Sequence, residues 1–244
     1  MIAIDEIINI ALNAGRYALD IFNNDFNIYY KNDKSPLTEA DLVVNDYICK
    51  SLTKYNIPII SEENKNIQYS VRKNWEYCWL IDPIDGTKEF INKNKEWTIN
   101  IALIHNGQPI LGVVYAPALK LLYNAQQNKG AYKNNVKLPL ELNKNTYKIV
   151  ASKSHLNDET KYFIDNIKTN LDKEFISIGS SLKLCLVASG EADCYPRLAP
   201  TMEWDTAAAH IIVSESGKNV YNYHTLKPLK YNKENLLNPY FVAK

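Results

Sequence analysis

The stretch Trp79-Leu80-Ile81-Asp82-Pro83-Ile84-Asp85-Gly86-Thr87-Lys88-Glu89-Phe90 decides how this sequence is interpreted. It opens with an apolar run, Trp79 to Ile81, that is typical of the end of a buried β-strand. The run stops at Asp82-Pro83, and the turn pair Asp85-Gly86 follows. Because a residue before proline favours extended backbone, we expect Asp82 to leave the strand tip without folding back.

The two carboxylates of this stretch, Asp82 and Asp85, can converge on one point because a rigid proline separates them. Convergent carboxylates repel each other and raise each other's pKa unless a cation lies between them. Oxygen ligands of this kind suit Mg²⁺. A plain hairpin turn explains Asp-Gly equally well, since the pair is a common hairpin signal. The stretch alone therefore leaves a metal site and a turn as open alternatives.

Length and composition indicate a large globular protein. The 244 residues suffice for one domain or two tightly joined subdomains. Hydrophobic residues make up 46% and charged residues 23%, which is typical of a soluble protein. The 28 basic and 27 acidic side chains leave a net charge of +1, so no global field indicates binding to nucleic acid or to an acidic membrane.

The cysteines and the apolar runs indicate the compartment. Cys49, Cys78, Cys185 and Cys194 form no CxxC pair, which favours a reducing cytoplasm over a zinc site or a disulfide framework. The segment Met1–Glu6 contains acidic residues at the place where a secretion signal needs basic residues. No apolar run reaches the ~18 residues that span a bilayer. We expect a cytoplasmic protein without an integral membrane segment.

Periodicity predicts alternating helices and strands. Helices are expected at residues 4–22, from Thr38 to about Tyr55 with Leu42, Val43, Ile48 and Leu52 facing inward, and at 157–168, 182–188 and from 203 onward. Strands are expected at residues 28–30, 58–60, 97–104, 110–115, 121–123, 130–132, 148–151 and 193–197, with Asn106-Gly107 as a hairpin turn. This alternation indicates a layered α/β protein. A polar segment at 134–146 divides the chain into expected subdomains of residues 1–140 and 141–244.

Three further acidic positions have ordinary structural explanations. Asp41 lies in the first turn of the helix that Thr38 begins, where a capping box explains it and is favoured when the residue is taken alone. Glu62 and Glu63 follow a strand end, where α/β proteins bind ligands, but a solvated loop is the simpler explanation. Asp205 opens a helix, where it could be an N-cap.

Two basic residues lie where an anion could bind. Lys183 is in the first turn of the helix that follows Ser177–Ser181, which is unfavourable to the helix dipole and indicates another role. The start of that helix is either an anion site or a plain serine cap. Arg197 follows a strand and is either a surface charge or a bidentate phosphate clamp.

Four separate segments resemble the inositol monophosphatase superfamily of Mg²⁺-dependent, lithium-sensitive phosphatases. Asp82–Thr87 resembles its first signature and Trp204–Ala209 its second. Ser61–Glu63 stands where its glutamate ligand is expected, and Thr38–Asp41 resembles the segment with its water-activating aspartate. The resemblance runs from residue 1 to about 240. It implies an αβαβα sandwich of two mixed or antiparallel sheets between helix layers.

The segments Lys88–Phe90, Ser177–Lys183, Tyr195–Arg197 and Asn238-Pro239 resemble the CysQ-type branch, the 3′(2′),5′-bisphosphate nucleotidases. That branch implies hydrolysis of the 3′-phosphate of 3′-phosphoadenosine 5′-phosphate to give AMP, with its sulfated precursor as a further substrate. One departure is Ala209, where the family commonly carries glycine. The methyl group removes no ligand.

The resemblance also implies roles for individual residues. Two or three Mg²⁺ ions would be held by Glu62, Asp82, the Ile84 carbonyl, Asp85 and Asp205, with Asp41 also counted among the metal residues and Glu63 as an outer ligand. Asp41 and Thr87 would orient and deprotonate the attacking water, with Glu62 also counted as catalytic. Substrate-binding residues would be Gly86, Thr87, Lys88, Ser180, Lys183, Arg197 and Asp205. No Cys or Ser is placed as a nucleophile beside a base, which favours direct hydrolysis.

Two alternatives stay open. One is an inositol monophosphatase or a broad sugar-phosphate phosphatase, and the other is a catalytically silent nucleotide-binding protein. The presence of Asp41 and Thr87 favours an enzyme, because a binding module needs no water activation. The expected partner is a nucleotide bisphosphate and not nucleic acid, and the chain is expected to be a monomer or a homodimer. Peripheral attachment at the inner membrane is reported for some relatives, but this sequence shows no basic amphipathic segment that would serve as an anchor.

Overall fold

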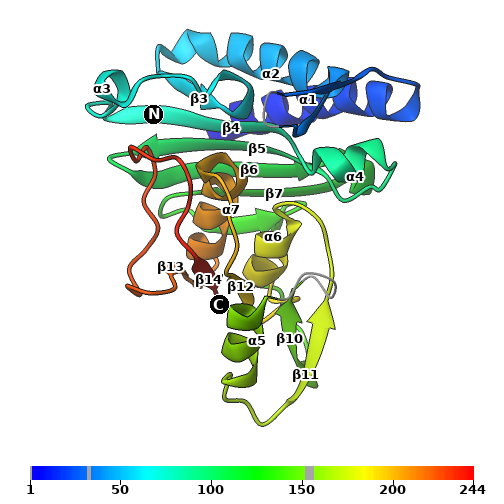
Figure 1. The fold of residues 1–244 in the computed structure, drawn as a ribbon, viewed down its shortest axis with the longest axis vertical. Coiled ribbons are helices and arrows are strands. Elements are labelled where there is room, and N and C mark those ends of the chain that lie inside the picture. Colours follow the sequence, from blue (N-terminus) through cyan, green and yellow to red (C-terminus); the bar gives the residue numbers. More distant parts are fainter. Residues whose placement is uncertain (1, 32–33, 152–156) are drawn as a thin grey trace.

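The layers of the fold are clear in the computed structural model, which describes residues 2–31, 34–151 and 157–244. Helices α1 (Ile4–Asn23) and α2 (Glu39–Leu52) lie along one side of a large β-sheet (Figure 1). Helices α6 (Leu182–Ser189) and α7 (Glu203–Glu215) lie on the other side, and smaller sheets with α5 (Asp158–Asp165) follow beyond them. The structure thus confirms the expected layered α/β class.

The large sheet forms the centre of the molecule. Its strands follow the order β3 (Ile59–Ser61), β4 (Tyr77–Asp85), β5 (Thr98–His105), β6 (Gln108–Ala116), β7 (Leu121–Gln126), β8 (Ala131–Lys133) and β9 (Val136–Lys137). Only the β3–β4 pair of this sheet is parallel. Asn106 and Gly107 both have positive φ between β5 and β6, as a type I′ hairpin requires, so this predicted hairpin is confirmed.

Strand β4 differs from the expectation in one respect. It does not stop at Asp82 but continues through Pro83 to Asp85. Its pairing with β5 shifts register between Asp82 and Asp85, and its pairing with β3 ends at Ile81. A bulge of this kind accommodates a proline, which could not sit in a regular ladder flanked on both sides.

The smaller sheets lie beyond α6 and α7. Strand β10 (Thr146–Val150) pairs in parallel with β11 (Asp172–Ile176), and β14 (Phe241–Ala243) pairs between β12 (Tyr195–Arg197) and β13 (Val220–Asn222). A bridge between Ile149 and Cys194 sets these two sheets side by side. The division at 140/141 remains our proposal for the subdomains. The remaining elements are β1 (Ile28–Tyr30), β2 (Pro36–Thr38), α3 (Tyr69–Arg72), α4 (Thr87–Ile91) and the 3₁₀ turns Thr53–Tyr55, Glu62–Asn64 and Pro117–Leu119.

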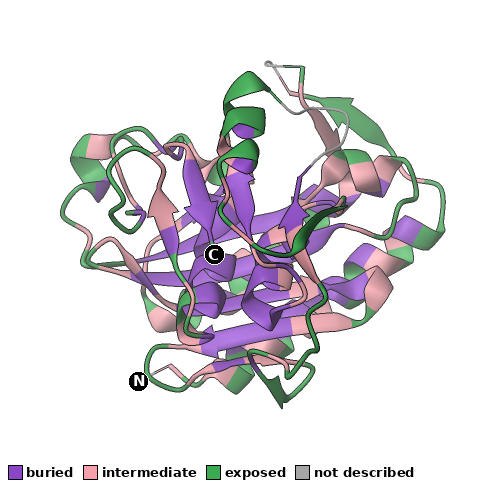
Figure 2. Cartoon of the chain, turned by 90° about the horizontal axis from the view of Figure 1, so that it is seen from below, coloured by how far each residue is buried: buried purple, intermediate pink, exposed green. Residues whose placement is uncertain are grey.

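Each face of the large sheet has its own core, and the buried residues concentrate in the sheet and the helices against it (Figure 2). Helix α2 buries Ala40, Val44 and Ile48, whereas Leu42 is 45% and Val43 38% exposed. The prediction that Leu42 and Val43 face inward was therefore wrong, because the buried face of α2 runs through Ala40 and Val44. No described helix combines the length and apolarity needed to cross a membrane.

Gly112 sets the spacing between strand β6 and helix α7. A Cβ atom built there would lie 2.3 Å from the Ala208 carbonyl oxygen and 2.5 Å from Ile211 Cγ2. We predict that Gly112→Ala lowers the free energy of unfolding by about 1–3 kcal/mol, since the helix must move away from the sheet. Denaturant titration measures this. The control is Gly130→Ala, where positive φ strains the backbone but the nearest atom is 3.6 Å away. A Gly112 loss no larger than the control's would contradict the close contact.

Candidate active site

Five carboxylates from distant segments come together at one end of the large sheet. Asp82 and Asp85 lie on β4, and Glu62 follows the tip of β3. Asp41 is in the first turn of α2 and Asp205 in the first turn of α7. The charges of the other four all act on Asp82, so the predicted convergence is present in the structure.

Asp82 is the most constrained member of this acidic cluster. Its side chain is buried, and burial, followed by repulsion from Glu62, raises its pKa well above the ordinary value. Its Oδ1 atom has no hydrogen-bond partner in the described part of the chain. A buried, unpartnered carboxylate oxygen is costly, so this atom is suited to a cation.

Asp85 and Asp205 are joined through Ser181. The Ser181 hydroxyl lies 2.7 Å from Asp85 Oδ2 and 2.6 Å from the Asp205 carbonyl oxygen, and the Ser181 N–H donates to Asp85 Oδ2 at 2.7 Å. Burial raises the pKa of both carboxyls, that of Asp205 to about 8, while Lys183 opposes the rise at Asp85. Ser181 at the start of α6 therefore hydrogen-bonds both the carboxylate of Asp85 and the backbone carbonyl of Asp205.

Asp205 does not occupy the N-cap position that the sequence suggested. The N-cap of α7 is Met202, and Asp205 Oδ2 accepts from the Met202 N–H at 2.9 Å. This hydrogen bond fixes one oxygen of the carboxylate by helix geometry. The structural role and the predicted site role are therefore compatible.

Asp41 likewise combines capping with a place in the site. Its Oδ2 accepts from the Thr38 N–H at 2.7 Å and the Thr38 hydroxyl at 2.5 Å, which confirms the capping box. Its other oxygen, Oδ1, lies 3.4 Å from the Thr87 hydroxyl, which is also 3.3 Å from the Ile84 carbonyl oxygen. Burial raises the Asp41 pKa to about 6. A carboxyl near this pKa is suited to general-base work close to neutral pH.

Glu62 and Glu63 meet a lysine that no sequence pattern singled out. Lys31 Nζ donates to Glu62 Oε1 at 2.8 Å and to Glu63 Oε1 at 2.7 Å. Burial would lower the Lys31 pKa, but the two carboxylates outweigh it and raise that pKa. Glu63 is only 7% exposed, so the solvated-loop explanation does not hold for it.

A second residue missed from the sequence is Asn100 on β5. It is buried, and its Nδ2 donates to Ser181 Oγ at 2.8 Å and to Asp85 Oδ2 at 3.3 Å. Thr98 donates in turn to Asn100 Oδ1 at 3.1 Å. The one available signal was an amide between two isoleucines in an apolar strand, which is typical of a satisfied buried polar group.

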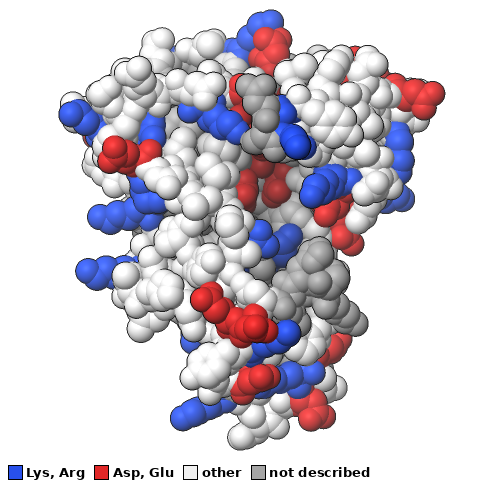
Figure 3. All heavy atoms as spheres, viewed as in Figure 1, with Lys and Arg blue, Asp and Glu red and all other residues white. Residues whose placement is uncertain are grey.

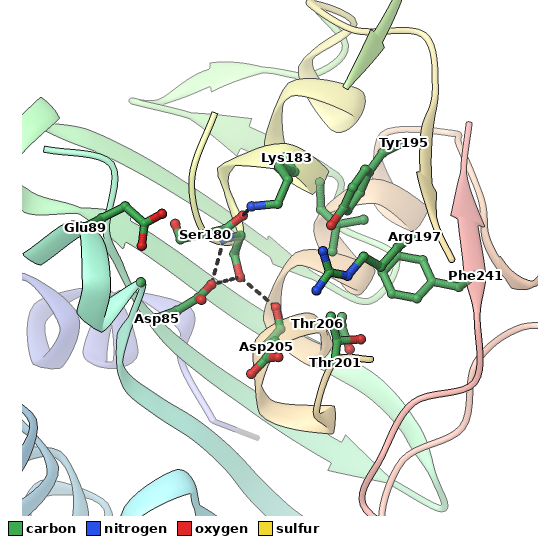
Figure 4. Close-up of a pocket in the computed structure, with 13 residues that line it drawn as sticks. Asp85, Glu89, Ser180, Lys183, Tyr195, Arg197, Thr201, Asp205, Thr206 and Phe241 are labelled. Atoms are coloured by element: carbon green, nitrogen blue, oxygen red, sulfur yellow. Dashed lines mark hydrogen bonds between the residues drawn. The ribbon is translucent and has the colours of Figure 1, made fainter. Parts of the chain in front are cut away.

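A cavity of about 200 Å³ adjoins the acidic cluster (Figure 4). Lys183 projects into it and donates to the Ser180 carbonyl at 2.8 Å, while burial lowers its pKa against the attraction of Asp85. Arg197 donates to the Pro200 carbonyl at 2.8 Å, and its buried Nε has no partner among the described residues. The cavity thus presents two cations with hydrogen-bonding capacity to spare.

The other predicted substrate-binding positions divide into two groups. Gly86, with φ of 94°, and Ser180 line the cavity, and Thr87 begins α4 beside it. Lys88 is exposed and does not line the cavity, so its role stays a prediction. On the face of the molecule that Figure 3 shows, acidic side chains lie deep in a hollow and basic side chains lie around its edge.

The donor set fits magnesium in kind. Every candidate ligand is an oxygen, as Mg²⁺ prefers, and Asp82 Oδ1 has no other partner in the described ranges. Within residues 2–31, 34–151 and 157–244, however, no three His, Cys, Asp or Glu side chains enclose a metal position as they stand. Lys31 holds Glu62, and Ser181 with Asn100 holds Asp85.

Comparisons with known proteins identify the family and agree with the fold. The inositol monophosphatase family model matches residues 3–239. The 3′(2′),5′-bisphosphate nucleotidase CysQ of Escherichia coli K12 is 39% identical over 98% of this chain and 98% of its own, and that of Haemophilus influenzae is 35% identical over 98% and 91%. The crystal structure of CysQ from Bacteroides thetaiotaomicron has a TM-score of 0.89 at 43% identity, covering 98% of this chain and 95% of that one.

The raised carboxyl pKa values predict how stability depends on pH. Because Asp205 titrates at about 8 in the folded protein but near its ordinary value when unfolded, the folded state binds more protons. The metal-free protein should therefore lose stability as the pH rises from about 4 to about 8, and Mg²⁺ should stabilise it more at the upper end. Thermal unfolding with and without Mg²⁺ measures both effects. Asp205→Asn should flatten the pH dependence, and a slope identical to that of the unmodified protein would contradict the assignment.

Proposed function

This chain belongs to the inositol monophosphatase family, and we propose that it is a magnesium-dependent 3′(2′),5′-bisphosphate nucleotidase. Its proposed reaction removes the 3′-phosphate of 3′-phosphoadenosine 5′-phosphate and leaves AMP and phosphate. The observation that carries the proposal is the cavity with Lys183 and Arg197 directly beside the acidic cluster. Relatives from Escherichia coli, Salmonella typhimurium and Haemophilus influenzae are named 3′(2′),5′-bisphosphate nucleotidase CysQ, which supports the same activity.

Two anion sites side by side favour a substrate with two phosphates. A monophosphate would need only the acidic cluster and its cations. Arg197 has a buried Nε without a partner in the described residues, so it offers a charge-assisted hydrogen bond to a second phosphate. Lys183 adds a positive charge from the same cavity. We therefore assign the non-reacting 5′-phosphate to Lys183 and Arg197, with Ser180 beside them.

The proposed metal ligands are Glu62, Asp82, the Ile84 carbonyl, Asp85 and Asp205, with Glu63 behind Glu62. Bound Mg²⁺ supplies a water of lowered pKa and neutralises charge on the leaving oxygen. The protein's own contribution is to hold these oxygens in place before any ion arrives. Ser181, Asn100 and the Met202 N–H already fix two of the carboxylates.

The remaining chemistry falls to Asp41 and the start of α4. Asp41 Oδ1 faces the Thr87 hydroxyl, so the pair is placed to orient a water and accept its proton. The backbone N–H groups of Gly86 and Thr87 lie where the helix begins, and the glycine permits close approach of a phosphate oxygen. Holding the 5′-phosphate at Arg197 fixes the reacting phosphate between these groups.

Phosphate release from three substrates tests the function. We expect turnover of 3′-phosphoadenosine 5′-phosphate to exceed that of inositol monophosphate, with the sulfated precursor as an additional substrate. A preference for inositol monophosphate would identify the alternative, an inositol monophosphatase or broad sugar-phosphate phosphatase. Binding of the nucleotide without any release, at saturating Mg²⁺, would identify a silent nucleotide-binding protein.

We also propose a cytoplasmic location, which the four free thiols support.

Arg197→Ala separates the two phosphate sites. We predict that it weakens use of the bisphosphate by about 2–4 kcal/mol, because it removes one side of a charged pair. Small monophosphates should be hydrolysed nearly as before. The measurement is kcat/KM on both substrate types, and an equal loss on both would refute the assignment of Arg197.

Asp41→Asn separates the base from the metal ligands. We predict a fall in kcat of about 10²- to 10⁴-fold, since the amide cannot accept the proton of water. Mg²⁺ binding, followed by calorimetry, should persist. The matched variant Asp205→Asn should instead raise the Mg²⁺ concentration needed for binding and cut kcat. If Asp41→Asn retained full kcat, another group would have to be the base.

A further inference from the structure

A second cavity of about 500 Å³ adjoins the one beside the acidic cluster. The two cavities share Glu89, Lys183, Tyr195 and Arg197 in their walls. Two of these shared residues are the cations assigned to the 5′-phosphate. Glu89 is the acidic member, and neither the metal site nor the phosphate clamp uses it.

Glu89 lies over the place proposed for the reacting phosphate. A Cβ atom built on Gly86 would lie 3.2 Å from Glu89 Oε2, and one built on Gly179 would lie 3.1 Å from Glu89 Cγ. The side chain therefore lies between the start of α4 and the loop before α6. Figure 4 shows its carboxylate beside Ser180, across the cavity from Arg197.

This carboxylate makes no hydrogen bond or ion pair within the described residues, although its charge acts on Lys183. A free carboxylate in a cavity for a bisphosphate repels the phosphate groups of that ligand. A ligand that presents a hydrogen-bond donor at that point offsets the repulsion. A first-turn acid also favours the dipole of α4, but that effect does not depend on the ligand.

We propose that Glu89 accepts a hydrogen bond from the ribose 2′-hydroxyl and so makes the enzyme select ribonucleotides over deoxyribonucleotides. This assignment rests on the proposed function. With the 3′-phosphate at Gly86 and the 5′-phosphate at Arg197, the sugar spans the wall that Glu89 lines. The hydroxyl next to the reacting phosphate is then the donor nearest to this carboxylate.

The experiment compares 3′-phosphoadenosine 5′-phosphate with its 2′-deoxy analogue. Glu89→Ala should lower kcat/KM for the ribonucleotide by about 10- to 100-fold, as expected for a hydrogen bond to a charged group, and should leave that for the deoxy analogue unchanged or higher, because the repulsion there has no compensating donor. Glu89→Gln keeps an oxygen acceptor at the same place, so it should lose less and shows that the protein still folds. The control is Glu96→Ala, which removes a carboxylate that already accepts from the Gly179 N–H at 2.8 Å and should not change the ratio.

Each outcome is informative. An equal loss on both nucleotides would mean that Glu89 acts through Lys183 or the helix, and no loss would mean that it is not used; both overturn the assignment alone. If the unmodified protein hydrolyses neither bisphosphate but hydrolyses inositol monophosphate, the proposed function fails and the assignment fails with it.

Discussion

Repulsion among buried carboxylates is the constraint on which this structure depends. The charges of Asp85 and Asp205 raise the pKa of Asp82, which is buried, while Asp85 and Asp205 themselves are partly buried in the cavity wall. The fold offsets part of this repulsion, because Asp85 Oδ2 and Asp205 Oδ2 accept hydrogen bonds from backbone N–H groups, whereas Asp82 Oδ1 has no partner among the described residues. The fold therefore holds a concentration of negative charge that becomes favourable when a cation binds.

The layered architecture supplies those donors. Helices α2, α6 and α7 all begin beside the end of strand β4, and the N–H groups of their N-cap residues donate to the carboxylates. Close packing of α7 on the sheet, through the missing side chain of Gly112, sets the depth at which Asp205 enters. Positions of the acidic groups thus follow from helix starts and strand ends rather than from flexible loops.

Local patterns predicted most of the fold because they depend only on near neighbours. The long helix at the N-terminus, the β5–β6 hairpin and the helix after Ser181 were all predicted from periodicity and turn residues. The passage of β4 through Pro83 was not, since a bulge depends on the partner strand. The site roles of Lys31, Asn100 and Glu89 did not follow from local patterns, because those roles come from contacts with distant segments. The roles given to the acidic residues came from resemblance, and the structure adds the reasons why they can coexist.

The bridge from Lys31 to Glu62 and Glu63 has a consequence for how ions enter. The metal-free protein carries its own tethered counter-ion, so an arriving Mg²⁺ exchanges with an ammonium group instead of adding to a bare acid pair. A +2 ion in place of the +1 ammonium would raise the local charge by one unit instead of two, and it would end the ion pairs that tie Lys31, next to β1, to the turn after β3.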